Sequence, residues 1–191
     1  MKILKVIFFL FVAKTSFANI ILPSVFSDHM VLQQTDDVKF WGWASPNEEV
    51  IIEPSWTDET YRIKTNNISH WEIMIKTPKY GGPYTIQFKG YNEIILNDIL
   101  IGEVWLCSGQ SNMEMTANWS GGITNGEVEA KKANHPNIRF FNVPKISAEY
   151  PQNNLLANWV LCTPETMKNN SAVAYFFAER LQDGLKDVVC F

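Results

Sequence analysis

The stretch from Leu96 to Met115, LNDILIGEVWLCSGQSNMEM, decides the fold that we expect for the second half of this chain. Its first part, Ile99 to Leu106, is a short and nearly continuous apolar run, which predicts a buried strand. Its last part, Cys107 to Asn112, consists of small and polar residues. The stretch therefore predicts a buried strand that stops in a turn and presents polar side chains there.

Ser111 is the residue of this turn for which we predict a chemical role. A strand that ends in a glycine-containing turn with a hydroxyl residue is one way in which α/β hydrolases present a nucleophile. Gly109 lets the backbone bend where a side chain would clash, and the Ser111 backbone N–H is a candidate donor to an oxyanion. Most serines at strand ends only satisfy turn hydrogen bonds, so the spacing alone leaves a structural role open.

Three neighbours of Ser111 have weaker assignments. Gln110 and Asn112 are expected either to order the turn or to contact a substrate. Glu114, three positions after Ser111, is expected on a following helix as a solvated or capping carboxylate rather than as a catalytic acid.

Residues 19–97 show short apolar segments separated by turn residues. Strands are expected at Val38–Trp43, Glu48–Glu53, Tyr61–Lys64, Trp71–Lys76, Tyr84–Lys89 and Ile94–Leu96. Gly81–Pro83 is expected to break the chain before the fifth of these strands. The pattern predicts an antiparallel β-sandwich-like module.

Residues 98–191 instead alternate between strand-like and helix-like segments. Strands are expected at Ile99–Leu106, Ile138–Val143 and Trp159–Cys162, and helices at Glu127–Ala133 and Ser171–Leu185, with Gly184 as a stop signal. The last residues, Lys186–Phe191, resemble the entry into a further parallel strand. The alternation predicts the first part of an incomplete three-layer α/β/α domain.

Composition excludes some classes of function and partner. Apolar residues make up 46% and aromatic residues 13% of the chain, which favours a packed core over disorder. The net charge of −4 gives no electrostatic reason to expect nucleic acid as a partner. Seven tryptophans are compatible with core packing and also with stacking on sugar rings.

Residues 1–18, MKILKVIFFLFVAKTSFA, have the pattern of a secretory signal peptide. Lys2 and Lys5 precede an apolar segment, Val6–Ala13, that is too short to span a bilayer. We therefore expect an exported protein (periplasmic, extracellular or in a lysosome-like compartment) without a membrane anchor after cleavage. The oligomeric state stays open.

Three cysteines, Cys107, Cys162 and Cys190, are an odd number for an exported protein. One disulfide is compatible with an oxidising compartment, and the pairing of Cys162 with Cys190 stays open. Cys107 is expected to be an inert thiol in a buried strand. The chain has no Cys-x-x-Cys motif and its histidines are isolated, so no metal site and no cofactor are expected.

A family resemblance adds to this interpretation. The segment GEVWLCSGQSNMEM, with LPSVFSDHMVLQQ near the start and GGPYTI between them, resembles the sialate O-acetylesterases, carbohydrate esterases of the SGNH-hydrolase superfamily. The resemblance covers nearly all of the chain after residue 19. It implies an accessory β-domain before an SGNH-type catalytic domain, Ser111 as nucleophile, and an O-acetylated sialic acid or a related acetylated glycan as substrate.

The resemblance also implies a catalytic histidine and aspartate from an Asp-x-x-His motif, which this sequence lacks. The histidines are His29, His70 and His135, and none has an aspartate three positions before it. His29 and His70 lie in the predicted β-module and His135 in an Asn-His-Pro loop, where structural roles are expected. We therefore expect a truncated member of the family (a gene fragment, a frameshifted copy or a partial sequence) that is inactive alone.

The sequence supports a second hypothesis from another class. The product would be non-catalytic, and its β-module would serve as a carbohydrate-binding or interaction domain. The tryptophans of that module support this alternative, namely Trp41, Trp43, Trp56 and Trp71. A third possibility is a truncated chain without function.

Overall fold

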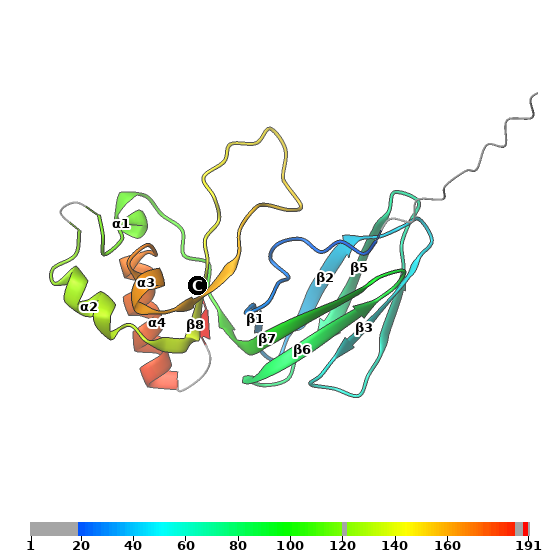
Figure 1. The fold of residues 1–191 in the computed structure, drawn as a ribbon, viewed down its shortest axis with the longest axis horizontal. Coiled ribbons are helices and arrows are strands. Elements are labelled where there is room, and N and C mark those ends of the chain that lie inside the picture. Colours follow the sequence, from blue (N-terminus) through cyan, green and yellow to red (C-terminus); the bar gives the residue numbers. More distant parts are fainter. Residues whose placement is uncertain (1–18, 120–121, 186–188, 191) are drawn as a thin grey trace, which may run out of the picture.

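The structure of the protein is a computed structural model that describes residues 19–119, 122–185 and 189–190. The predicted signal peptide, residues 1–18, lies outside these ranges. The fold is mixed and rich in sheet, with few helices (Figure 1). The labelled helices lie at one end of the molecule, and strands β2, β3, β5 and β6 lie at the other.

The first seven strands are β1 Val31–Gln33, β2 Asp37–Trp43, β3 Glu49–Pro54, β4 Tyr61–Lys64, β5 His70–Lys76, β6 Gly81–Lys89 and β7 Glu93–Val104. The remaining strands are β8 His135–Phe141, β9 Trp159–Cys162 and β10 Val189–Cys190. The helices are α1 Ser111–Glu114, α2 Gly126–Lys132, α3 Pro164–Met167 and α4 Ala172–Leu185.

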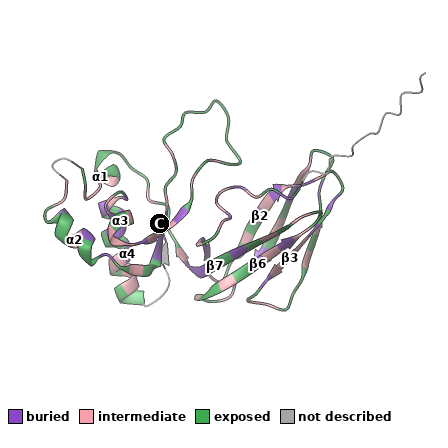
Figure 2. Ribbon diagram, in the orientation of Figure 1, coloured by how far each residue is buried: buried purple, intermediate pink, exposed green. Residues whose placement is uncertain are grey.

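Two sheets of the first half enclose one hydrophobic core. Strands β2 and β5 pair with each other, and β4, β3, β6 and β7 follow one another in a second sheet. Phe40 of β2 and Trp71 of β5 lie 6.3 and 6.1 Å from the ring of Phe88 of β6. Burying each such ring stabilises the fold by about 1.5–3 kcal/mol. The alternation that predicted these strands therefore marks the face that each strand buries (Figure 2).

Strand β7 connects the two halves. Residues 93–101 of β7 pair antiparallel with β6, residues 100–102 pair parallel with β1, and Glu103 and Val104 pair parallel with β10. We expected two strands, Ile94–Leu96 and Ile99–Leu106, but the structure has one twelve-residue strand. Asp98 takes a left-handed conformation (φ 55°) without ending the strand. The predicted boundary between residues 97 and 98 lies inside β7.

The second half continues the sheet in the order β7, β10, β8, β9. Helices α2, α3 and α4 lie beside these strands, and a second core forms from Ala130, Ala133, Ile138, Phe140, Cys162, Met167, Tyr175 and Ala178. The backbone of β10 lies parallel to both β7 and β8. This confirms the expected entry into a further parallel strand.

Four local predictions were wrong. Trp105 and Leu106 follow β7, which ends at Val104, and are exposed. Gly81–Pro83 does not break the chain but begins β6, since Gly81 pairs with Ile101. His135 is the first residue of β8 rather than a loop cap. Helix α4 continues through Gly184 to Leu185.

A long loop, residues 142–158, extends from β8 and returns to the first half (Figure 1). The Trp41 indole donates to the backbone oxygen of Asn153 at 3.2 Å, and Ser24 N donates to Asn154 Oδ1 at 2.9 Å. Trp159, which follows the loop, belongs to the core of the first half. The two halves are thus joined by contacts as well as by β7.

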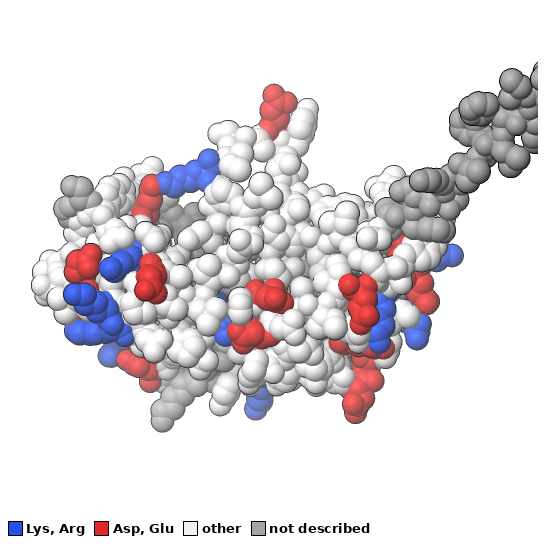
Figure 3. Space-filling view, viewed as in Figure 1, with Lys and Arg blue, Asp and Glu red and all other residues white. Residues whose placement is uncertain are grey.

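The surface is mixed in charge. Acidic and basic side chains are interspersed on the face shown in Figure 3. In the described part of the chain, no helix combines the length and apolar character needed to cross a bilayer; the longest, α4, has 14 residues.

Candidate active site

The turn predicted to carry the nucleophile joins β7 to α1. After Val104 the chain runs without regular structure to Gln110, and α1 then begins at Ser111. A Cβ atom on Gly109 would lie 2.9 Å from Cβ of Met113, closer than real contacts allow. Gly109 is therefore required because the turn folds closely onto α1, and it does not have a positive φ.

Ser111 is the first residue of α1 and is exposed, as are Gln110 and Asn112. The Gln110 side chain makes no capping hydrogen bond, whereas its backbone oxygen accepts from Glu114 N at 3.0 Å. The first amides of a helix have no acceptor within the helix. The N–H groups of Ser111 and Asn112 also find none elsewhere in the described residues, so they are available to an anionic oxygen.

Helix α4 holds this turn in place. The backbone oxygen of Met115 accepts from Ala172 N at 2.9 Å. Ser171 Oγ lies 3.5 Å from the sulfur of Met113 and accepts from Ala174 N at 3.2 Å, which caps α4. The start of α4 therefore fixes the position of α1.

An apolar pocket of about 290 Å³ lies beside the turn. It is lined by Trp105, Leu106, Cys107, Ser108, Met113, Val173, Ala174 and Phe177. The rings of Trp105 and Phe177 meet edge to face at 5.3 Å. The sequence did not predict this pocket, because its walls come from the segment after β7, from α1 and from α4, and α4 lies about 60–70 residues further along the chain.

The described cysteines are free thiols. Cys107 lies after β7 and is half-buried, so its placement in a buried strand was wrong. Burial raises the pKa of Cys107 and raises the pKa of Cys162 to about 11. Both thiols are therefore protonated at neutral pH and unsuited to nucleophilic attack. The side chain of Cys190 lies outside the described part of the chain.

Glu114 forms an ion pair with Lys145 of the long loop. Its side chain is 48% exposed, as expected for a solvated carboxylate. The sequence did not predict the pairing of Lys145 with Glu114, because the two residues are 31 positions apart.

The three histidines contact residues other than Ser111. His29 Nδ1 lies 2.6 Å from Asp98 Oδ2, and His135 Nε2 lies 3.4 Å from Glu179 Oε1. The His70 ring lies 6.3 Å from the ring of Trp43. No interaction found in the described residues joins Ser111 to a histidine or a carboxylate side chain.

Asp98 also binds Arg139, and sequence reasoning missed this cluster. Arg139, which is buried, donates to Asp98 Oδ2 at 3.0 Å and to Oδ1 at 3.3 Å. Partial burial raises the pKa of Asp98, but the hydrogen bonds from Arg139 and His29 together lower this pKa by more. The pKa of Asp98 is therefore below its ordinary value. The cluster therefore pairs an ionised carboxylate with a buried guanidinium between β7 and β8.

A metal site would need several acidic, histidine or cysteine side chains close together. In residues 19–119, 122–185 and 189–190, no three of them gather closely enough to hold a metal ion.

Comparison with known proteins gives sialate O-acetylesterases as sequence relatives. No protein-family model matches the chain. The human sialate O-acetylesterase is 31% identical over 182 residues, and the mouse sialate O-acetylesterase is 30% identical over the same length. These alignments cover 85% of this chain but 34% and 33% of the relatives. The chain thus spans about a third of the length of the curated relatives that it matches.

A solved structure shows the same relation in three dimensions. The crystal structure of a carbohydrate acetylesterase from Xanthomonas citri superposes with a TM-score of 0.83 at 30% identity. The superposition covers 90% of this chain and 39% of that protein. Over the part that it shares with them, the chain is related in sequence to the sialate O-acetylesterases and in fold to a carbohydrate acetylesterase.

Proposed function

We propose that this chain supplies the nucleophile-bearing part of a carbohydrate esterase that hydrolyses O-acetyl esters of sialic acids or related acetylated glycans. The observation that carries this proposal is the relation to the sialate O-acetylesterases. The position of Ser111 supports it: Ser111 is exposed at the start of α1, next to backbone amides that find no acceptor among the described residues.

The proposed reaction begins at Ser111. Its Oγ attacks the acetyl carbonyl carbon while a base takes the hydroxyl proton. The carbonyl oxygen becomes an oxyanion, which the Ser111 N–H stabilises. The sugar oxygen leaves with a proton, and water then releases acetate from the acyl-enzyme. Gln110 and Asn112 are exposed on both sides of Ser111, which supports a proposed role in contacting the sugar or in ordering the turn.

We propose that the base for this reaction is not among residues 1–191. Each of the three histidines contacts other residues, and no Asp-x-x-His motif occurs in the sequence. The 191-residue chain alone is therefore expected to release acetate no faster than its own Ser111→Ala variant.

The same proposal assigns roles to the two halves. Residues 19–97 form a sandwich-like accessory module, since two sheets share one core there. Residues 98–191 form the first part of an SGNH-type α/β/α layer, since β7, β10 and β8 are parallel and helices lie beside them. Residues 1–18 direct export, which a cleaved N-terminus in the native protein would support.

The decisive experiment measures acetate release from an O-acetylated sialic acid by the native protein and by the 191-residue chain. In whichever form is active, Ser111→Ala should lower the rate by about a thousandfold or more. Ser147→Ala is the control, because Ser147 is exposed in the loop of residues 142–158, lies outside the pocket beside Ser111 and should leave the rate nearly unchanged. In a form that releases acetate, equal rates for wild type and Ser111→Ala would exclude Ser111 as nucleophile. Release by the chain alone would place the base within it.

A separate observation supports a second function, carbohydrate binding by the β-module. Of the four tryptophans that suggested glycan binding, Trp71 is buried in the core, whereas Trp56 lines a surface pocket. We propose that the β-module binds carbohydrate whether or not the chain hydrolyses esters. Saturable binding of a glycan by the 191-residue chain supports this function, and a flat titration removes it.

A further inference from the structure

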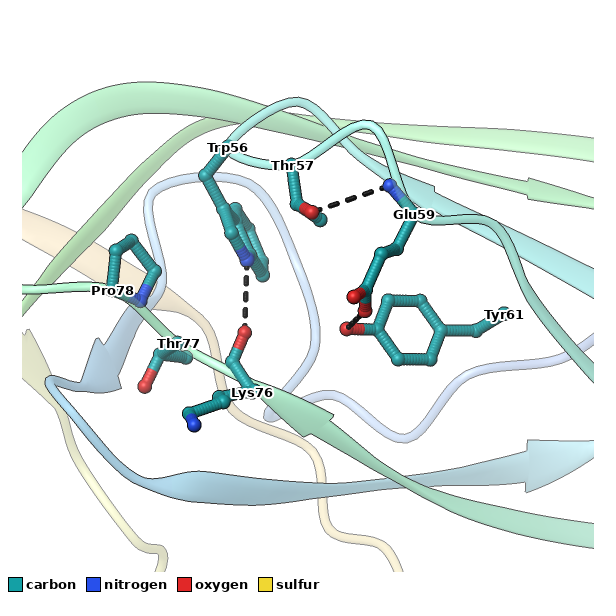
Figure 4. Close-up of a pocket in the computed structure, with 7 residues that line it drawn as sticks. All are labelled: Trp56, Thr57, Glu59, Tyr61, Lys76, Thr77 and Pro78. Carbon is teal, nitrogen blue, oxygen red and sulfur yellow. Dashed lines mark hydrogen bonds between the residues drawn. The ribbon is translucent and has the colours of Figure 1, made fainter.

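A second pocket lies on the first half of the molecule and shares no lining residue with the pocket beside Ser111. Its volume is about 240 Å³, and its walls come from the segment between β3 and β4 and from the end of β5 (Figure 4). It is lined by Trp56, Thr57, Glu59, Tyr61, Lys76, Thr77 and Pro78. Glu59 and Lys76 are exposed, so the pocket is open to solvent.

Two aromatic rings form opposite sides of this pocket. Figure 4 shows Trp56 on one side and Tyr61 on the other. The Trp56 indole donates to the backbone oxygen of Lys76 at 3.1 Å, and its ring packs edge to face on Tyr84 at 5.7 Å. These contacts fix the ring before any ligand arrives, which lowers the entropic cost of binding.

Polar groups lie between the rings. Tyr61 donates its hydroxyl to Glu59 Oε2 at 2.9 Å, and Glu59 N donates to Thr57 Oγ1 at 3.2 Å. Burial, then the bond to Glu59, raises the pKa of Tyr61, so the phenol keeps its proton and continues to donate. Within the described residues, Glu59 Oε1 and Lys76 Nζ have no hydrogen-bond or ion-pair partner. An acceptor and a donor therefore remain for a ligand.

We propose that this pocket binds a single sugar ring of a glycan. The C–H face of a pyranose packs on Trp56 or Tyr61, while its hydroxyls donate to Glu59 and accept from Lys76. At about 240 Å³ the pocket lies just below the range of roughly 300–1,000 Å³ for drug-sized ligands, which fits one ring and not an oligosaccharide. The inference rests on the second proposed function, for which it names the site, and it is independent of ester hydrolysis.

The test uses the 191-residue chain labelled with 5-fluorotryptophan and followed by ¹⁹F NMR. The probes are lactose, which is neutral, and 3′-sialyllactose, which is anionic. The Trp56 resonance, assigned by its loss in Trp56→Phe, should shift saturably with a Kd on the order of 1 mM. The resonance of Trp71, which is buried, should not follow it.

Variants separate this site from binding elsewhere. Glu59→Gln keeps the shape of the side chain and should weaken binding roughly tenfold, because a charged acceptor is lost. Trp43→Phe is the matched control, since Trp43 belongs to the same module, packs on His70 and lies outside the pocket. A thermal unfolding curve like that of the wild type shows that each variant is folded.

Two results would overturn the proposal. Binding that Glu59→Gln leaves unchanged would put the glycan elsewhere on the module, so the site would be wrong and the second function would stand. The absence of any shift with both probes at tens of millimolar would remove the site and the second function together. Neither result bears on Ser111.

Discussion

Three residues form the contact that most directly ties the two halves together. His29 and Asp98 both have positive φ angles, 67° and 55°, which residues other than glycine rarely adopt. Each such residue costs about 1–3 kcal/mol unless its surroundings hold it. Here Arg139 binds the carboxylate of Asp98 and also donates to the backbone oxygen of His29 at 3.3 Å. The buried guanidinium thus stabilises both strained residues.

The first prediction is that Asp98→Asn destabilises the protein by about 2 kcal/mol. This is less than the ~3–5 kcal/mol for breaking a fully buried pair, because the Asp98 side chain is 33% exposed. Urea unfolding measures the change. Glu49→Gln is the control, because its pair with Arg62 is exposed on both sides and should contribute less than about 1 kcal/mol. A similar effect of both variants would contradict a structural role for the cluster.

The pH dependence of stability follows from the same carboxylate. The pKa of Asp98 is lower in the folded protein than its ordinary value of about 3.9. Its contribution is therefore fully present above pH ~4 and is lost as pH falls through the folded pKa. The difference in unfolding free energy between wild type and Asp98→Asn should be constant near pH ~6 and shrink below pH ~4. A difference that grows on acidification would have the wrong sign.

At the scale of elements, β6 and β7 approach each other closely where the halves meet. Gly82 has φ +130°, and a Cβ atom there would lie 2.8 Å from the backbone oxygen of Ile99. Gly184 is the contrasting case, because it lies in α4 and a Cβ atom there would meet nothing within 4 Å. Gly82 is therefore required by its surroundings, whereas Gly184 only weakens the helix in which it lies.

The second prediction is that these two glycines respond oppositely to alanine. Gly82→Ala should destabilise the protein by about 2 kcal/mol or more, through backbone strain and the clash. Gly184→Ala should stabilise it by roughly 0.5 kcal/mol, since α4 gains a better helix former near its end. Thermal unfolding of both variants in one buffer measures the difference. Changes of the same sign would show that β6 is not held as described.

The sequence predicted most elements because each depends on local pattern. Alternation identified β2 and β5, and helical spacing identified α4. The local pattern was insufficient where pairing with distant strands sets the structure. The strand β7 continues through Asp98 because β6 and β1 pair along it. The candidate site likewise has one part that the sequence predicted and one part that it did not. The turn motif points to Ser111, whereas the apolar pocket beside it needs side chains from α4.

For the whole molecule, Trp159 joins β9 of the second half to the hydrophobic core of the first half. It follows the loop of residues 142–158, is 8% exposed in the core of the first half, and packs against Phe141 at 5.1 Å between ring centres. Its indole N–H donates to the backbone oxygen of Val25 at 2.8 Å. Because β9 carries this residue, the sheet of the second half is anchored in the first.

The third prediction is that Trp159→Ala destabilises the whole protein by about 3 kcal/mol, through the cavity and the unpaired oxygen of Val25. It should also expose the loop of residues 142–158 to faster proteolysis. Leu156→Ala in the same loop is the control, because Leu156 is 90% exposed and should change stability by less than about 0.5 kcal/mol. Unchanged proteolysis in Trp159→Ala would mean that the loop is held without Trp159.

The sequence by itself determined most of the strands, the longer helices and the turn that carries Ser111, because these depend on periodicity and on neighbouring residues. The tertiary structure alone decided that β7 runs through both halves, that Asp98 binds His29 and Arg139, and that Trp56 and Tyr61 face each other across a pocket. The physical reason is distance along the chain. Such contacts join residues that no local pattern relates, and only the packing of sheets and the pairing of buried charges bring them together.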